Sequence, residues 1–183
     1  LIKSWQEILR LLDESMSDSL LSEFHKCINL ILEANTVHIL GLRSSLAPAV
    51  YFENLLESFY PKTNQLSYNS DLIFDRILQF EEGDILFVIT NSPYTDRCLE
   101  AAEFCNRLGH SIILLTDHLS CPISSYADVI LQTVPSDKQY SIVPAIAIIE
   151  TIVIEIGKRT AITSIKKLKK LADILKEYNI TRS

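Results

Sequence analysis

Hydroxyl and amide side chains gather directly after an apolar run in the middle of the chain. Thr90, Ser92 and Thr95 supply three hydroxyls within one turn, and Asn91 adds an amide. The preceding run, Ile85–Ile89, has the composition of a parallel strand that is buried on both faces. A hydroxyl donates to a phosphate oxygen, and the backbone N–H groups that open a following helix add a favourable field. We therefore expect a phosphate-bearing small molecule to bind at this turn.

Helix capping is the alternative explanation for the same turn. Asn91 or Ser92 would then be the N-cap, Pro93 the first helical residue and Asp96 a first-turn acid. Capping accounts well for one hydroxyl and less well for three. The position at a strand end favours the ligand interpretation.

A second loop follows an earlier apolar strand and could form the other side of the site. Gly41 permits a tight turn, and Ser44 or Ser45 can cap the next helix. We take Ser44 and Ser45, with Thr90, Asn91, Ser92 and Thr95, as the six candidate ligand contacts. Arg43 either contacts an anion or is a solvent-exposed charge. These two alternatives stay open at the level of the sequence.

The remaining candidates for chemistry are few. His118 lies in a loop after a predicted strand, and Glu150 lies within a long apolar helix, either as a buried base or as a polar side chain facing an interface. No GxxxxGK[ST] or GxGxxG motif occurs, and neither the histidines nor the cysteines have the spacing of metal ligands. We therefore expect no metal and no cofactor, and we assign no catalytic residue.

An alternation of strands and helices would position these residues. Strands are expected at 36–40, 64–68, 85–89, 111–115 and 128–131, and helices at 45–59, 70–80, 93–108, 122–126 and from Tyr140 onward. This pattern predicts an α/β fold, a three-layer αβα sandwich around a five-stranded parallel sheet of order 2-1-3-4-5. Ligands in such a sheet bind between the first and third strands, where the two loops would meet.

Helices are also expected at both ends of the chain. Two helices at 4–14 and 18–34 form an N-terminal lead-in, residues 1–33, to a domain of residues 34–183. Residues 142–156 are too short and too charged to span a bilayer, so we expect a buried helix with one face on a homodimer or higher homo-oligomer. A basic amphipathic stretch at 165–178 follows.

Composition limits the classes of function. The chain has 183 residues and a net charge of −6, which argues against its gripping nucleic acid by itself. Four cysteines without CxxC spacing predict free thiols in a reducing cytoplasm, and no secretory signal or membrane span is visible. The sequence starts within a helical pattern and without Met, as expected of a fragment.

The segment Asp84–Asp96, DILFVITNSPYTD, resembles the Asp-hydrophobics-Ser-x-Ser-Gly-x-Thr-x-Glu loop of the SIS (sugar isomerase) domain. The resemblance continues, in order, through Ala34–Ser45 upstream and through AAEFCNRLG and SIILLTDHLSCPISSYADVIL downstream, over roughly residues 18–160. With its helical lead-in, the chain is most similar to the C-terminal domain of RpiR-type transcription regulators. In that family an N-terminal helix-turn-helix binds DNA and the SIS domain senses a phosphosugar.

The resemblance implies phosphosugar contacts at Ser45, Thr90, Ser92 and Thr95. Two residues depart from the family pattern: Arg43 stands where a second glycine is usual, and Pro93 stands at the loop glycine and removes an N–H donor. The site then either binds an altered ligand or has lost binding.

Three functions follow from this resemblance. The preferred one is a non-enzymatic phosphosugar-sensing and dimerisation domain, which reaches DNA only through a domain absent from this chain. The alternative is an aldose–ketose phosphosugar isomerase, for which Glu150 or His118 would be the base. A third is a dimerisation module without ligand, which Arg43 and Pro93 favour.

Overall fold

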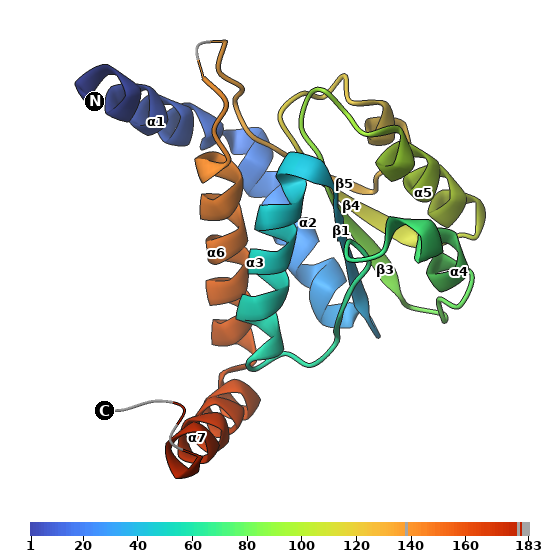
Figure 1. Cartoon of the computed structure of the whole chain (residues 1–183), viewed down its shortest axis with the longest axis vertical. Coiled ribbons are helices and arrows are strands. Elements are labelled where there is room, and N and C mark those ends of the chain that lie inside the picture. The colour runs from blue at the N-terminus through green and yellow to red at the C-terminus, as the bar shows by residue number, and fades with distance from the viewer. Residues whose placement is uncertain (138, 179, 181–183) are drawn as a thin grey trace.

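Five parallel strands form the centre of the structure, a computed structural model that describes residues 1–137, 139–178 and 180 (Figure 1). The strands are β1 (Val37–Gly41), β2 (Thr63–Gln65), β3 (Ile85–Ile89), β4 (Ser111–Thr116) and β5 (Val129–Gln132). Their order in the sheet is β2-β1-β3-β4-β5. The predicted fold class and strand order are therefore confirmed.

Helices cover both faces of the sheet (Figure 1). One face carries α2 (Asp18–Glu33), α3 (Leu46–Glu57) and α6 (Val143–Arg159), with α1 (Ile2–Ser15) packed against α6. The other face carries α4 (Ile73–Ile77) and α5 (Asp96–Arg107). Short 3₁₀ turns lie at Arg43–Ser45, Ser70–Leu72 and Pro122–Ser125, and α7 (Ala161–Glu177) follows α6.

The apolar run of β3 is buried on both sides, as the sequence predicts. Ile85, Phe87 and Ile89 pack in the cluster under α2, α3 and α6, whereas Leu86 and Val88 pack in the cluster under α4 and α5. The alternation follows from the two-residue period of a strand. The hydroxyl-rich loop follows directly after β3 and therefore lies at the carboxyl end of the sheet.

The four cysteines are free and buried, and they divide between the two layers. Cys27 packs in the cluster beneath α2, whereas Cys98, Cys105 and Cys121 pack on the α5 side. Burial raises the pKa of the Cys98 and Cys105 thiols to about 12. These thiols therefore stay protonated and act as small apolar side chains.

Several element boundaries differ from the sequence expectation. The edge strand β2 covers Thr63–Gln65 rather than 64–68. The helix predicted from Pro93 begins at Asp96, with Thr95 as its N-cap, because residues 90–95 run as an irregular loop over the strand ends. Neither Asn91 nor Ser92 is the N-cap and Pro93 is not in the helix, so these parts of the capping alternative are wrong, whereas Asp96 is a first-turn acid as that alternative expected.

The C-terminal helices also differ. α6 begins at Val143 rather than Tyr140, with Pro144 in its first turn, where a missing N–H costs nothing. Gly157 lies inside α6 without interrupting it. The helix ends instead near Thr160, whose hydroxyl donates to the Ile156 carbonyl over 2.7 Å. The basic stretch expected at 165–178 falls in α7.

The N-terminal helices pack onto the sandwich. Ser17 caps α2, since its hydroxyl accepts the Leu20 N–H over 3.1 Å. Cys27, Ile28 and Ile31 of α2 are fully buried in the core. The division into a lead-in of residues 1–33 and a domain of residues 34–183 stays a prediction. Within the described residues, no helix combines the length and apolarity that a membrane crossing requires.

A candidate anion-binding site at the strand ends

Strand register brings the two predicted loops together. Gly41 is the β1 partner of Ile89, and Ile89 is the β3 partner of Leu115, so the carboxyl ends of β1, β3 and β4 are level. The Thr90 N–H then donates to the Leu115 carbonyl over 3.1 Å. The loops that follow these three strands therefore start side by side at the switch point of the sheet.

The loops after β1 and β3 enclose a cavity of about 350 Å³. Its lining includes all six residues proposed as ligand contacts, together with Arg43: Arg43, Ser44, Ser45, Thr90, Asn91, Ser92 and Thr95. Leu42, Pro93 and Tyr140 complete the wall. The structure thus gathers hydroxyls from two separate loops around one space, and their role as ligand contacts stays a prediction.

Two helices begin directly after residues of this cavity's wall. α3 starts directly after the Arg43–Ser45 turn, and α5 starts directly after Thr95. The first N–H groups of a helix have no partner within it, and the dipole makes this end partly positive. Thr95 makes no side-chain cap hydrogen bond, so its hydroxyl is left for another acceptor. Such a pair of helix ends is suited to an anion.

Gly41 allows the first loop to turn closely over α3. A Cβ at this position would lie 2.3 Å from the Ser45 carbonyl oxygen and 2.8 Å from the Ala49 Cβ. The Gly41 N–H donates to the Ser67 hydroxyl over 2.9 Å, which fixes the end of β1. The position of Ser45 in the wall therefore depends on the absence of a side chain at residue 41.

Arg43 adopts a backbone conformation that L-residues avoid. Its φ of 55° lies in the left-handed region, where glycine is the usual residue. The side chain is exposed and lines both the main cavity and an adjoining space of about 430 Å³ over the start of α5. A cation thus stands beside the hydroxyls, on a strained backbone.

Sequence reasoning missed Asp117, the first residue after β4. Its carboxylate accepts the Ser92 N–H, at 3.2 Å to Oδ1 and 3.1 Å to Oδ2, and the Tyr94 hydroxyl at 3.4 Å. Burial, together with the charge of Asp117, raises the pKa of Tyr94 to about 12, so this phenol remains a donor. The predicted strand order placed the fourth strand beside the third. A carboxylate at the end of the fourth strand could therefore have been expected near the loop that follows the third.

A second polar cavity of about 420 Å³ adjoins the first. Asn91, Ser92 and Pro93 line both, and the loop between β5 and α6 forms the far wall of the second. His118 lies in this second cavity with Asp117. Sequence reasoning placed His118 near the site but missed the contribution of the β5–α6 loop, including Tyr140.

Glu150 is not brought to the site. It lies on the exposed side of α6, where its carboxylate accepts the Tyr51 hydroxyl over 2.5 Å. Of the two alternatives for Glu150, the buried base is wrong, because the apolar residues of α6 face the core and Glu150 is exposed. Of the two bases considered for an isomerase, His118 alone lies beside the cavity.

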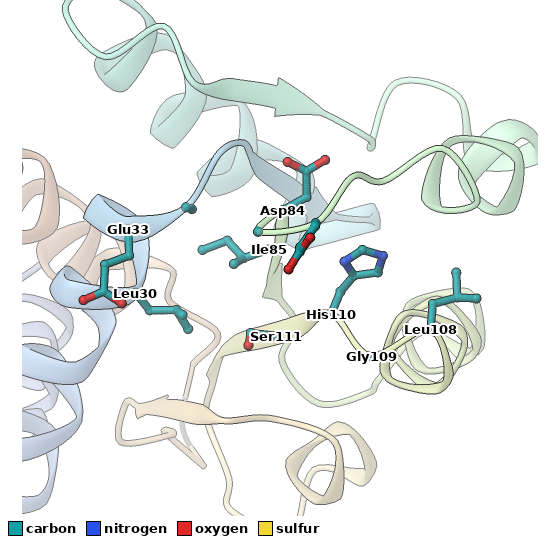
Figure 2. A pocket seen from close by; sticks show the side chains of 11 residues that line it. Leu30, Glu33, Asp84, Ile85, Leu108, Gly109, His110 and Ser111 are labelled. Carbon is teal, nitrogen blue, oxygen red and sulfur yellow. The ribbon is translucent and has the colours of Figure 1, made fainter.

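A third cavity, of about 500 Å³, opens at the opposite, amino end of the sheet. Figure 2 shows Glu33, Asp84 and His110 around it. Asp84 bonds to His38 over 3.1 Å and accepts the Glu81 N–H over 3.0 Å. Although burial opposes it, these hydrogen bonds hold the pKa of Asp84 below its ordinary value. With Glu33, Glu82 and Asp84 in its wall, this cavity repels phosphate.

Comparison with protein families gives one clear match. The family model described as SIS domain matches residues 30–155 of the chain. An uncharacterised HTH-type transcriptional regulator of Bacillus subtilis, YbbH, is 27% identical over 116 residues, which cover 63% of this chain and 41% of the relative. The chain thus aligns with less than half the length of that relative.

Solved structures share the fold at low identity. The sugar isomerase domain of an RpiR transcription factor from Sphaerobacter thermophilus has a TM-score of 0.88 at 18% identity, covering 94% of this chain and 97% of that one. Vibrio vulnificus NanR, complexed with ManNAc-6P, has a TM-score of 0.86 at 15% identity, covering 98% and 69%. Phosphoheptose isomerase GmhA from Neisseria gonorrhoeae has a TM-score of 0.75 at 16% identity, covering 85% of this chain and 96% of that one.

Proposed function

Because the chain belongs to the SIS domain family, we propose that it is a phosphosugar-sensing domain of a transcriptional regulator rather than an enzyme. The observation that carries the proposal is the cavity at the switch point, where hydroxyls from two loops and two helix N-termini converge. Similarity to an HTH-type regulator and to an RpiR-type factor supports the regulatory assignment. The DNA-binding part would lie outside this sequence.

The phosphoryl group would bind where the positive ends of the helices meet the hydroxyls. Thr90, Ser92 and Thr95 donate from one side, Ser45 from the other, and Arg43 supplies a full charge. Charge-assisted hydrogen bonds of this kind are about twice as strong as neutral ones. NanR, a structural neighbour, was solved with a phosphosugar, which supports the ligand class.

The sugar would extend into the second cavity. Its wall combines carboxylate, imidazole, amide and hydroxyl groups: Asp117, His118, Gln139, Tyr140 and Ser141. These groups pair with the hydroxyls of a sugar, which both donate and accept. Since the two cavities share Asn91, Ser92 and Pro93, one ligand can occupy both.

Isomerase activity is the second candidate because of His118. Proton transfer between neighbouring sugar carbons needs a base within hydrogen-bond reach of the substrate carbon. His118 lines the sugar cavity, and solved isomerases share the fold. Turnover of a phosphosugar by this chain that disappears in His118→Ala would contradict the sensor proposal.

Ligand binding is expected to stabilise the chain against heat. At a concentration of about 100 times Kd a ligand adds about 2.7 kcal/mol, which raises Tm by about 5–10 °C in a domain of this size. A thermal-shift series over pentose, hexose and N-acetylhexosamine phosphates, with the unphosphorylated sugars as controls, measures this. Ser92→Ala should reduce the shift, whereas Ser125→Ala, an exposed hydroxyl in the 3₁₀ turn Pro122–Ser125, should not.

Two outcomes decide the assignment. A shift that appears only with phosphorylated sugars and falls in Ser92→Ala supports the sensor. No shift with any phosphosugar, with Ser92→Ala and the unchanged chain behaving alike, would leave a dimerisation module as the function.

We also propose that the sensor acts as a homodimer through the outer side of α6 and the helices at its ends. Ile154 on α6 is 56% exposed, Trp5 on α1 is 63% exposed, and Ile162 on α7 is 93% exposed. α7 extends away from the sandwich at the far end of α6 from α1 (Figure 1). An amphipathic helix of this length gains most of its stability from packing, so a partner is needed. The lysines of α7 suit a second copy, since the chain is acidic overall.

Ile154→Glu is expected to convert the dimer to a monomer at micromolar concentration, because it places a charge in an apolar contact. Sedimentation velocity measures the change. Asn106→Glu, an exposed position on the opposite layer in α5, is the matched control and should stay dimeric. A chain that is monomeric before any substitution would refute the dimer.

A further inference from the structure

Asp117 holds a donor that a bound phosphate would need. Both of its carboxylate oxygens accept the Ser92 N–H, and Oδ1 also accepts the Tyr94 hydroxyl. Ser92 lies in the wall of both cavities, where a phosphoryl group would join the sugar, and its N–H is directed at Asp117 in the second cavity. A carboxylate, like a phosphate, is an anion that only accepts hydrogen bonds.

The Ser92 amide is a backbone donor of this loop that Asp117 occupies. The next residue, Pro93, has no N–H, and the Thr90 N–H is already bonded to the Leu115 carbonyl. A phosphate oxygen that binds at the Ser92 amide therefore competes with Asp117 for the same hydrogen. Two like charges cannot share that hydrogen at close range without a large electrostatic cost. A phosphate oxygen that takes the Ser92 N–H must therefore displace the carboxylate from it.

The backbone around Asp117 is tied to the wall of the sugar cavity. Its carbonyl accepts from Gln132 Nε2 over 3.4 Å. The Thr116 carbonyl accepts the Thr133 N–H over 2.8 Å, where the β5–α6 loop begins. A shift of the Asp117 backbone would therefore change these contacts with Gln132 and with the start of the β5–α6 loop.

That loop is anchored in turn to α1. The Val134 N–H donates to the Ser15 hydroxyl over 2.9 Å, and the Ser136 hydroxyl donates to Glu7 over 2.6 Å. The hydrogen bonds thus run from the phosphate loop through Asp117 and the β5–α6 loop to the N-terminal helix. A ligand can influence a distant helix only if the connecting segment has two arrangements and the ligand binds one of them more tightly.

We propose that Asp117 is a resident competitor for ligand phosphate: its carboxylate holds the Ser92 amide until a phosphoryl group displaces it, and the release loosens the tie to α1. The inference rests on the proposed function, because it needs a phosphorylated ligand at this loop. It adds a residue that tunes affinity and a reason why binding would change the N-terminal helix.

The test is Asp117→Asn, which keeps the shape of the side chain and removes its charge. Isothermal titration with inorganic phosphate and with the phosphosugar of largest thermal shift should give a Kd about tenfold lower than for the unchanged chain, since a neutral amide competes less well than a carboxylate. Tyr94→Phe removes one donor to Asp117 and should tighten binding by a smaller factor. It serves as the second variant should Asp117→Asn fold poorly.

Glu100→Gln is the matched control. Glu100 lies on α5 beside the adjoining cavity and pairs with Arg97, so the variant loses the same charge without touching the Ser92 amide. Its Kd should stay within about twofold, because exposed charges are screened by salt. Equal tightening in Glu100→Gln and Asp117→Asn would show a general charge effect and overturn the proposal.

The remaining outcomes separate the two proposals. If the unchanged chain binds and Asp117→Asn binds no more tightly, the competitor is refuted and the sensor stands. If neither binds any phosphate compound, the sensor is refuted and the competitor falls with it. Hydrogen exchange supplies an independent readout: ligand should speed amide exchange at Val134 and in α1 of the unchanged chain, and unchanged exchange there would refute the coupling.

Discussion

Gly41→Ala is expected to destabilise the chain by about 2–3 kcal/mol and to abolish phosphosugar binding. The added Cβ would meet the Ser45 carbonyl oxygen at 2.3 Å and the Ala49 Cβ at 2.8 Å. The Ser45 carbonyl oxygen belongs to the backbone, so the clash cannot be relieved by moving a side chain. The turn that leads into α3 must shift instead. Urea unfolding should show a lower midpoint with an unchanged slope.

Gly157→Ala is the matched control for this experiment. A Cβ there would lie 3.8 Å from the Phe59 ring, an ordinary contact, within the regular helix α6. Alanine in a helix interior is favoured over glycine by about 0.5–1 kcal/mol, so this variant should be slightly more stable. Gly41→Ala with the stability and binding of the unchanged chain would show that the first loop does not shape the site.

Arg43→Gly is expected to weaken phosphosugar binding by about 10–100-fold while leaving the fold as stable or more stable. A hydrogen bond to a charged group contributes about 1.5–3 kcal/mol, which sets the loss of affinity. Glycine relieves the left-handed backbone at φ 55°, which costs an L-residue about 1–2 kcal/mol. Titration calorimetry measures the loss of affinity, and urea unfolding measures the gain in stability. Opposite changes of this kind are expected where a strained backbone conformation serves binding.

Arg43→Asn separates the two causes. Asparagine tolerates the left-handed region better than most residues and adds no glycine flexibility, yet it removes the charge. It should match Arg43→Gly in affinity. Unchanged affinity in both variants would identify Arg43 as a solvent-exposed charge, the alternative left open by the sequence.

The sheet and the meeting of the two loops were predictable because they depend on local signals. The unbroken run Ile85–Ile89 requires burial on both faces, and alternation with helices requires parallel strands. Strand order then determines which strand ends are neighbours. The loops at Gly41 and Thr90 meet for this reason, and the structure brings their residues to one cavity.

The missed features depend on contacts between distant parts of the chain. Asp117 lies 25 residues from the amide that it accepts, and a Thr-Asp pair after a strand has no local signature for that contact. The orientation of Glu150 follows from how α6 packs on α3, which an all-apolar helix does not reveal. The start of α5 was misplaced because Pro93 is equally at home in a loop and in a first helical turn.

The division of the four cysteines between the layers gives the protein a built-in chemical reporter. A protonated, buried thiol reacts with a disulfide reagent only when its surroundings open, because the thiolate is the nucleophile. The reaction rate of Cys27 therefore reports how often the layer that contains α1, α2 and α6 opens. The rates of Cys98 and Cys105 report the opening of the α5 layer. The rate at which each cysteine is labelled, measured by mass spectrometry, would show which layer opens more often when a ligand binds. No engineered probe is needed.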